Sequence, residues 1–366
     1  MFTNDQIEKY QRCMVMAGGG FRFGIYLGMY AAACEAGRKP DLLLASCGGA
    51  MAAAIIHGLP ENAQRKAWLM SKQMYEFCCQ LKPSYRCSIV PIFFQALKRK
   101  LSKQAAPLIP DLFNDYLFEI PLPLPLPPSP SETVQPALAL ICSKLLFSEN
   151  EVLQARGKRK LFAETVRCEP RGAALLQEMP SPFAHPRWGE HALSADLLTD
   201  VQMPLHDAVR ISLADFFYFQ CHPYKREYYS GGVLDLFPIE VAKQLAHEII
   251  IEFKQSFDQK FATAAWRSVL GLDANQRLRY VHGQFADVWV DTSDIEEILK
   301  NQQVQKKIDW RNNCISLRPP DSYEAHVCYM NQQWEYGYQR AMQAFESPPN
   351  HKSQMRNINR YNRPEA

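Results

Sequence analysis

The chain of 366 residues is long enough for one large domain or two small ones, and its hydrophobic content of 47% is ample for a buried core. Its formal net charge of +3 is close to neutral, which argues against a nucleic-acid-binding protein. No run of about 18 apolar residues is present, so we expect no membrane-spanning helix.

The cysteines and the N-terminus bear on the compartment. The 11 cysteines are an odd number, and none forms a C-x-x-C pair with histidines at zinc spacing. We therefore expect free thiols in a reducing cytoplasm, with no metal and no cofactor. The first residues include acidic side chains and lack an apolar core, so no signal peptide is expected.

The first predicted elements are a strand over 13–17 and a helix over 24–35, with Gly18, Gly19 and Gly20 between them. Consecutive glycines let backbone N–H groups converge on an anion. That anion could be a nucleotide phosphate or the oxyanion of an acyl transfer intermediate. The lysine and hydroxyl of a P-loop do not follow, and no G-x-G-x-x-G is present, so the nucleotide alternative is weak.

A second buried strand is predicted over 41–46, and a helix of small and aliphatic residues over 50–57. The turn between them places Cys47 above the sheet at the positive end of the helix, which is the geometry of a nucleophile elbow. The helix N-terminus and the adjacent amides are expected to favour the thiolate. Cys47 is therefore the candidate nucleophile.

A third glycine motif, Ser230-Gly231-Gly232, lies far downstream and continues to Pro238. With the glycine loop and the elbow, in this order and spacing, it makes the chain resemble the patatin-like phospholipase family. The match extends over residues 12–60 and 200–255. The resemblance implies a three-layer α/β fold, with a mostly parallel central sheet and helices on both faces. It also implies an acyl hydrolase that acts through a serine–aspartate dyad.

Four positions depart from the family pattern. Cys47 replaces the nucleophilic serine, and Ser230 replaces the aspartate of the dyad. Ala45 replaces the first glycine of the elbow, and Phe23 replaces the glycine after the basic residue of the loop. The fold inference survives these changes, but the usual activity does not follow from it. A thiol needs a weaker base than a hydroxyl does, so the two dyad replacements make chemical sense together.

Three residues are candidates for assisting the thiol. Ser230 cannot act as a base at neutral pH, but it could orient water or hydrogen-bond the sulfur. Asp235 and His222 are candidate bases, although each is more commonly a structural or packing residue at such a place. The sequence leaves the identity of the base open.

The glycine loop supplies the remaining site residues. Backbone amides of Gly18, Gly19, Gly20 and Phe21 would form an oxyanion hole. Arg22 either contacts a substrate phosphate or pins the loop to neighbouring carboxylates. Phe23 adds bulk that would narrow or redirect an acyl pocket.

Three segments between the motifs have alternative interpretations. A predicted amphipathic helix over 60–79 either covers the sheet or forms a flap over an acyl pocket. A basic amphipathic helix over 92–103 is either half-buried or in peripheral contact with a membrane. The proline-rich segment 120–130 is either a stiff connection within the domain or a ligand for a proline-reading domain.

The second half of the chain alternates predicted strands and helices around one irregular insertion at 168–200. We interpret residues 1–346 as one patatin-like α/β domain, followed by a C-terminal extension at 347–366. The remaining predicted strands cover 137–147, 160–166, 248–253 and 285–291, and the remaining helices cover 204–217, 238–246 and a final stretch ending near 345.

Two functions are compatible with these motifs. The first is a patatin-like acyl hydrolase or acyltransferase in which Cys47 forms a thioester. Its substrate would be a lipid ester, a thioester or a carrier-bound acyl group, and water, an amine, an alcohol or a thiol would accept the acyl group. The second is a catalytically inactive relative that serves as a binding or regulatory module, for which a buried, unreactive Cys47 would be evidence.

Overall fold

The computed structural model describes residues 7–85, 88, 94, 106–128, 136–257, 262–311 and 313–347. Within these ranges a nine-stranded sheet forms the centre of the molecule, with strand order β11-β10-β1-β2-β5-β6-β7. The predicted basic helix over 92–103 lies outside the described residues except for Phe94. The predicted extension lies outside them except for Ser347.

The central strands run parallel from β11 to β5. Beyond β5 the sheet becomes mixed, because β6 and β9 both pair with β5 in the antiparallel sense, and β8 pairs with β9. The strands are β1 (Tyr10–Met16), β2 (Leu42–Ala45), β5 (Ala137–Leu145), β6 (Phe162–Arg167), β7 (Leu198–Asp200), β8 (His222–Tyr224), β9 (Glu227–Ser230), β10 (Ala246–Phe253) and β11 (Val288–Asp291).

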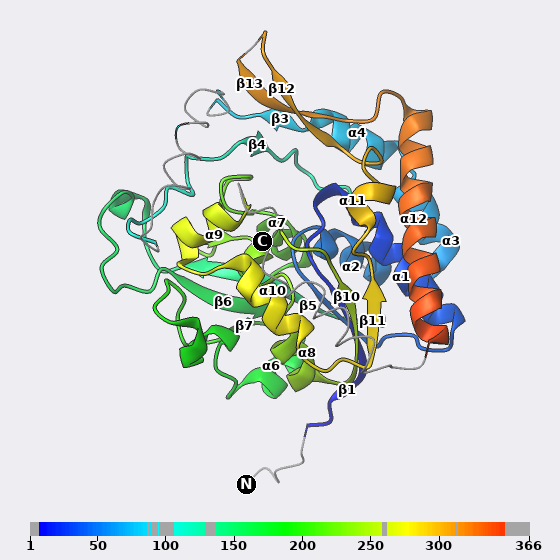
Figure 1. Cartoon of the computed structure of the whole chain (residues 1–366), viewed down its shortest axis with the longest axis horizontal. Helices are drawn as coiled ribbons and strands as arrows, with labels where there is room; N and C mark the ends of the chain where they lie inside the picture. The colour runs from blue at the N-terminus through cyan, green and yellow to red at the C-terminus, as the bar shows by residue number, and fades with distance from the viewer. Residues whose placement is uncertain are drawn as a thin grey trace, which may run out of the picture.

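Helices cover both faces of the sheet (Figure 1). One face carries α1 (Gly24–Glu35), α2 (Gly48–Gly58), α3 (Asn62–Leu69), α4 (Lys72–Gln80), α7 (Leu205–Ser212), α11 (Ile295–Ile298) and α12 (Tyr323–Glu346). The other carries α6 (Pro170–Leu176), α8 (Ile239–Leu245), α9 (Ala262–Leu270) and α10 (Ala274–His282). The three-layer α/β fold with a mostly parallel sheet is thereby confirmed.

The alternation of side chains along the central strands explains this layering. Met14 and Met16 of β1 enter the core beneath α1 and α2, whereas Cys13 and Val15 enter the core beneath α8 and α10. Both sets are almost completely buried, as expected for a parallel strand covered on both faces. Because helices cover both faces of the central strands, the ends of these strands are where a site can open to solvent.

Two short sheets lie outside the central one. β12 (Gln305–Asp309) and β13 (Cys314–Arg318) form an antiparallel hairpin, and β3 (Lys82–Pro83) pairs with β4 (Phe118–Glu119). Figure 1 shows the hairpin standing out from the rest of the molecule, next to β3 and α4.

The predicted elements correspond to observed ones, but several boundaries differ, and β8, β9, β12, β13, α9 and α10 are additional to the predicted elements. The helix predicted over 60–79 is two helices, because Ser71 accepts a hydrogen bond from the Met74 amide and starts α4. The helix predicted over 204–217 ends at Ser212. The insertion at 168–200 is more regular than expected, since it contains α6 and β7.

The proline-rich segment packs on the domain over its described part. Trp68 donates a 3.0 Å hydrogen bond through Nε1 to the Pro125 carbonyl, and the Leu124 amide donates to Nε2 of His206 at 3.2 Å. Across the described residues, no helix is both long and apolar enough to cross a membrane.

Candidate active site

The turn between β2 and α2 places Cys47 in a strained conformation. Its φ of 49° and ψ of −124° lie in a region that non-glycine residues rarely adopt. The next two residues must be glycine, because a Cβ on Gly48 would lie 2.4 Å from the Gly20 carbonyl oxygen. A Cβ on Gly49 would lie 2.0 Å from the Met16 carbonyl oxygen. The elbow is therefore pressed against β1 and the glycine loop.

Hydrogen bonds from three other segments fix the apex. The Cys47 amide donates to Ser212 Oγ at 3.0 Å, and that hydroxyl donates to the Ile141 carbonyl at 2.8 Å. Ser46 donates through Oγ to the Asp235 carbonyl at 2.9 Å. Contacts of this kind hold a strained backbone in place.

The thiol contacts one carboxylate. Cys47 Sγ lies 3.0 Å from Oδ2 of Asp215, a half-buried residue just beyond the end of α7. The sequence reasoning missed this residue. The available signal was a single carboxylate within the otherwise apolar stretch 213–219.

Burial shifts the pKa values of both partners upward. Burial raises the pKa of Asp215 to about 7, although the hydrogen bond from Cys47 opposes this shift. Burial also raises the pKa of the Cys47 thiol well above its ordinary value, with a further contribution from the Asp215 charge. The Gly48 amide and Lys254 lower that pKa, but by less. The expectation of a thiolate favoured by the helix N-terminus is therefore wrong, because desolvation outweighs it.

The three residues proposed to assist the thiol have other surroundings. Ser230 is buried at the end of β9, and its Oγ has no hydrogen-bond partner among the described residues. Asp235 is fully buried, and its carboxylate accepts hydrogen bonds from Arg277. His222 lies on β8 with Nε2 3.7 Å from Asp207. None of the three has a hydrogen bond to Cys47, whereas Asp215 does.

The glycine loop lies beside the thiol. A Cβ on Gly18 would lie 3.3 Å from the Cys47 Cβ, and Gly20 has a positive φ of 58°. Lys254 donates to the Gly18 carbonyl at 2.8 Å, which turns that carbonyl towards the end of β10.

Arg22 and Phe23 follow the glycines. The Arg22 guanidinium binds Glu296 of α11 with both Nη atoms, at 2.5 and 3.0 Å. Of the two alternatives for Arg22, the geometry supports pinning of the loop to a carboxylate. Phe23 is 5% exposed and belongs to the core beside the site, where its ring occupies space that the family's glycine would leave open.

A cavity of 380 Å³ opens onto Cys47 and Asp215. This volume lies within the range of small-molecule pockets. Its walls are mainly apolar, and Gln303 and Lys306 from the hairpin region contribute the polar part with Arg22 and Glu296. The apolar walls include Met51, Phe77, Leu81, Leu213, Phe219 and Val304.

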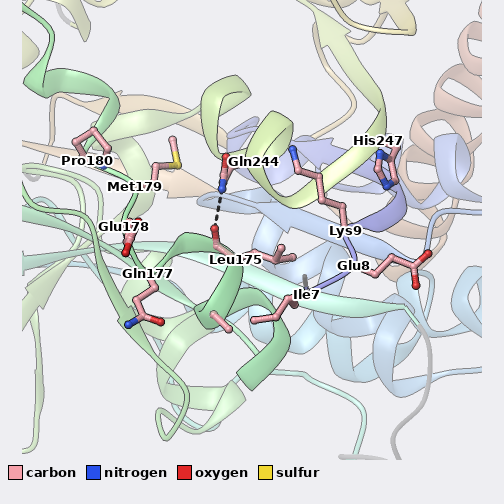
Figure 2. A pocket seen from close by; sticks show the side chains of 11 residues that line it. Ile7, Glu8, Lys9, Leu175, Gln177, Glu178, Met179, Pro180, Gln244 and His247 are labelled. Atoms are coloured by element: carbon pink, nitrogen blue, oxygen red, sulfur yellow. Dashed lines mark hydrogen bonds between the residues drawn. The ribbon is translucent and has the colours of Figure 1, made fainter. Parts of the chain in front are cut away.

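A larger and more open hollow of 920 Å³ lies away from this chemistry (Figure 2). It borders the amino end of β1, with Lys9 on one side and Gln244 on another, where Gln244 donates to the Leu175 carbonyl at 2.8 Å. Its lining contains no hydroxyl or thiol side chain. Within the described ranges, no three or more His, Cys, Asp or Glu side chains are grouped so that they could hold a metal ion.

Comparison with known proteins gives one matching family model and five matching chains of solved structures. The model of the patatin-like phospholipase family matches residues 14–243. The crystal structure of VipD from Legionella pneumophila is similar over 93% of this chain and 67% of that chain, with a TM-score of 0.36 and 13% sequence identity. No curated protein matches the chain. Because the family model covers well over half of the 366 residues, the chain belongs to the patatin-like phospholipase family, whose members are lipid acyl hydrolases.

Proposed function

We propose that the protein is an acyl hydrolase or acyltransferase in which Cys47 attacks the carbonyl carbon of an acyl ester or thioester. The observation that carries this proposal is the 3.0 Å contact between Cys47 Sγ and Asp215 Oδ2. A carboxylate with a pKa near 7 is well matched to proton transfer at neutral pH. Asp215 therefore replaces the acid that the family carries at the position of Ser230.

In the first half-reaction, Sγ bonds to the carbonyl carbon while the thiol proton passes to Oδ2 of Asp215. The carbonyl oxygen takes up negative charge beside the amides of Gly18 to Phe21. Each amide that reaches it would contribute about 3 kcal/mol. The bond to the leaving group then breaks, and Asp215 returns the proton to the departing alcohol or thiol.

The second half-reaction starts from a thioester on Cys47. Water, an alcohol, an amine or a thiol attacks the same carbon and gives its proton to Asp215. The carbon–sulfur bond breaks, and the sulfur recovers the proton from Asp215. A thioester is a good acyl donor to amines and thiols, so transfer is as compatible with this site as hydrolysis.

The cavity supports an acyl-bearing substrate. Its apolar walls suit a hydrocarbon chain. Cys47 is among the residues that line it, so the carbonyl end of such a chain would be held near the sulfur. A lipid ester, a thioester and a carrier-bound acyl group each satisfy this requirement.

A binding or regulatory module is the second candidate. The high pKa of the thiol and the bulk of Phe23 favour it, because both work against an open site with a reactive nucleophile. In that case the cavity would hold an acyl chain without cleaving it.

Acyl transfer to Cys47 distinguishes these functions. We would incubate the protein with short-chain and medium-chain acyl thioesters and locate the adduct by peptide mass spectrometry. The proposal predicts an acyl group on the Cys47 peptide and product release. Both should be absent in Cys47→Ala and present in the control Cys142→Ala, which removes another buried thiol. Acyl binding without an adduct, at neutral and mildly alkaline pH, would support the binding module instead.

A further inference from the structure

The β12–β13 hairpin carries large apolar side chains that are exposed. Trp310 in its turn is 76% exposed, and Ile308 is 51% exposed. Tyr85, just after β3, is 69% exposed. Tyr85 is near Ser88 in the sequence, and Ser88 forms a β-bridge with Cys314 at the start of β13. Exposed aromatic and aliphatic side chains gathered at one protruding element mark an interaction surface.

The apolar face of the hairpin is continuous with the cavity. Lys306 is opposite Leu317, and Ile308 is opposite Ile315, so these four side chains share one face of the hairpin. Lys306 and the preceding Val304 line the cavity that holds Cys47. The same face therefore runs from the cavity wall to the exposed Ile308.

The charge of the hairpin is positive. Lys306, Lys307 and Arg311 are exposed cations, against the carboxylate of Asp309. Cations beside exposed apolar side chains suit a bilayer that contains acidic lipids, because its headgroups are anionic and its interior is apolar. Tryptophan in particular favours the boundary between headgroups and acyl chains.

We propose that the β12–β13 hairpin docks on an anionic lipid bilayer, with Trp310 and Ile308 entering the interface and Lys307 and Arg311 contacting the headgroups. This orientation turns the cavity mouth towards the lipid, so that an acyl chain can enter without crossing water. The proposal rests on the proposed function for what enters the cavity, while docking itself is measured without catalysis. Figure 1 shows the hairpin clear of the central sheet, where it can reach a flat surface.

Sedimentation with vesicles tests the docking. The full chain is mixed with sucrose-loaded vesicles of phosphatidylcholine, with or without phosphatidylserine. We expect binding that phosphatidylserine strengthens and salt weakens. The double variant Trp310→Ala with Ile308→Ser should lose at least tenfold in affinity. Lys307→Gln with Arg311→Gln should lose the preference for phosphatidylserine, by a factor of about five for each cation.

The matched control is Leu153→Ser, which removes an apolar side chain that is 69% exposed at a site away from the hairpin. Equal sedimentation of the native protein and the Trp310 and Ile308 double variant would overturn the proposal. Native protein that stays in the supernatant would also overturn it. If the double variant then differs from the native protein only in its association state, the hairpin is a protein interface.

Turnover of a water-soluble short-chain thioester separates this proposal from the proposed function. None of the four substituted hairpin residues lines the cavity. Their variants should therefore keep this turnover if only docking fails. A failure of the Cys47 chemistry would instead remove turnover from the native protein and leave vesicle binding intact.

Discussion

Asp215 and Gly231 are in direct packing contact: a Cβ atom on Gly231 would lie 2.7 Å from Oδ1 of Asp215. The Gly231 amide also donates to the Ala214 carbonyl at 2.7 Å. The segment after α7 therefore lies against the loop in which the family carries its aspartate. Here the carboxylate reaches Cys47 from that segment, while the buried Ser230 hydroxyl has no hydrogen-bond partner among the described residues.

Substitutions at these two positions should have very different effects. Asp215→Asn removes the proton acceptor, so we expect kcat for a short-chain acyl thioester to fall by roughly 10²- to 10⁴-fold at neutral pH. Ser230→Ala removes a hydroxyl that makes no hydrogen bond within the described part of the chain, and it should change kcat little. Steady-state kinetics on both variants measure this. A larger loss of kcat in Ser230→Ala than in Asp215→Asn would contradict the assignment of the proton acceptor to Asp215.

The pH dependence of turnover should follow Asp215. Its carboxylate form accepts the proton, so kcat/KM should rise as the pH increases through about 7, where this side chain ionises. Asp215→Asn should lack this rise. Native activity that is already maximal well below neutral pH would show that Asp215 does not limit the reaction.

The same pKa predicts how stability changes with pH. Burial raises the pKa of Asp215 from its ordinary value of 3.8 to about 7, so the folded state holds a proton that the unfolded state releases. This contribution to stability is fully present below the ordinary value and is lost as the pH rises through 7. Asp215→Asn removes the dependence, so the variant should be the more stable protein at mildly alkaline pH.

The size of that gain is at most about 4 kcal/mol, because one pKa unit corresponds to about 1.4 kcal/mol and partial exposure reduces it. Urea unfolding of the native protein and the variant, at mildly acidic and mildly alkaline pH, measures the difference. If the two curves kept a constant separation across this range, the raised pKa would be refuted.

Gly48 tests the contact between the elbow and the glycine loop. In Gly48→Ala the new methyl group would lie 2.4 Å from the Gly20 carbonyl oxygen, which has to move away. We expect kcat to fall by at least tenfold through displaced oxyanion amides, with a smaller change in KM. A matched substitution is Gly157→Ala, where a Cβ meets nothing within 4 Å and only the positive φ is strained. Equal losses of activity in both would point to general destabilisation.

Local sequence patterns were sufficient for the elements that build the site. The strand, glycine loop and helix over residues 13–35 and the elbow at Cys47 could be predicted because each depends on neighbouring residues. The contact with Asp215 could not, since it joins positions 168 residues apart. The direction of the thiol pKa also failed, because helix polarity is visible in the sequence, whereas desolvation depends on the packed environment.

The break between α3 and α4 differs from these cases, because it depends on a local contact. A continuous apolar pattern over 60–79 favoured one helix, yet the Ser71 side chain caps a new helix within it. The family resemblance supplied the fold class and the three motifs. In the family, the aspartate of the dyad lies at the position of Ser230. Only the three-dimensional arrangement could show which other carboxylate contacts Cys47 in this chain.

Arg277 provides the last test, because it secures the loop beneath the elbow. Its Nη2 atom lies 2.7 Å from Oδ2 of Asp235 and 2.7 Å from Oε2 of Glu240, and its side chain is 3% exposed. The Asp235 carbonyl in turn accepts the hydrogen bond from Ser46, next to the nucleophile. Arg277→Leu leaves two carboxylates without their cation, so we expect a loss of about 3–5 kcal/mol in the free energy of unfolding.

A charge-matched variant separates pairing from packing. Adding Asp235→Asn to Arg277→Leu removes one of the unpaired charges and should recover part of the lost stability, although the packing of the arginine side chain stays lost. Urea unfolding measures both variants, and acylation of Cys47 by a thioester reports whether the elbow stays in place. Unfolding of Arg277→Leu at the same urea concentration as the native protein would show that the ion pair does not secure this loop. A further loss of stability on adding the second substitution would show the same.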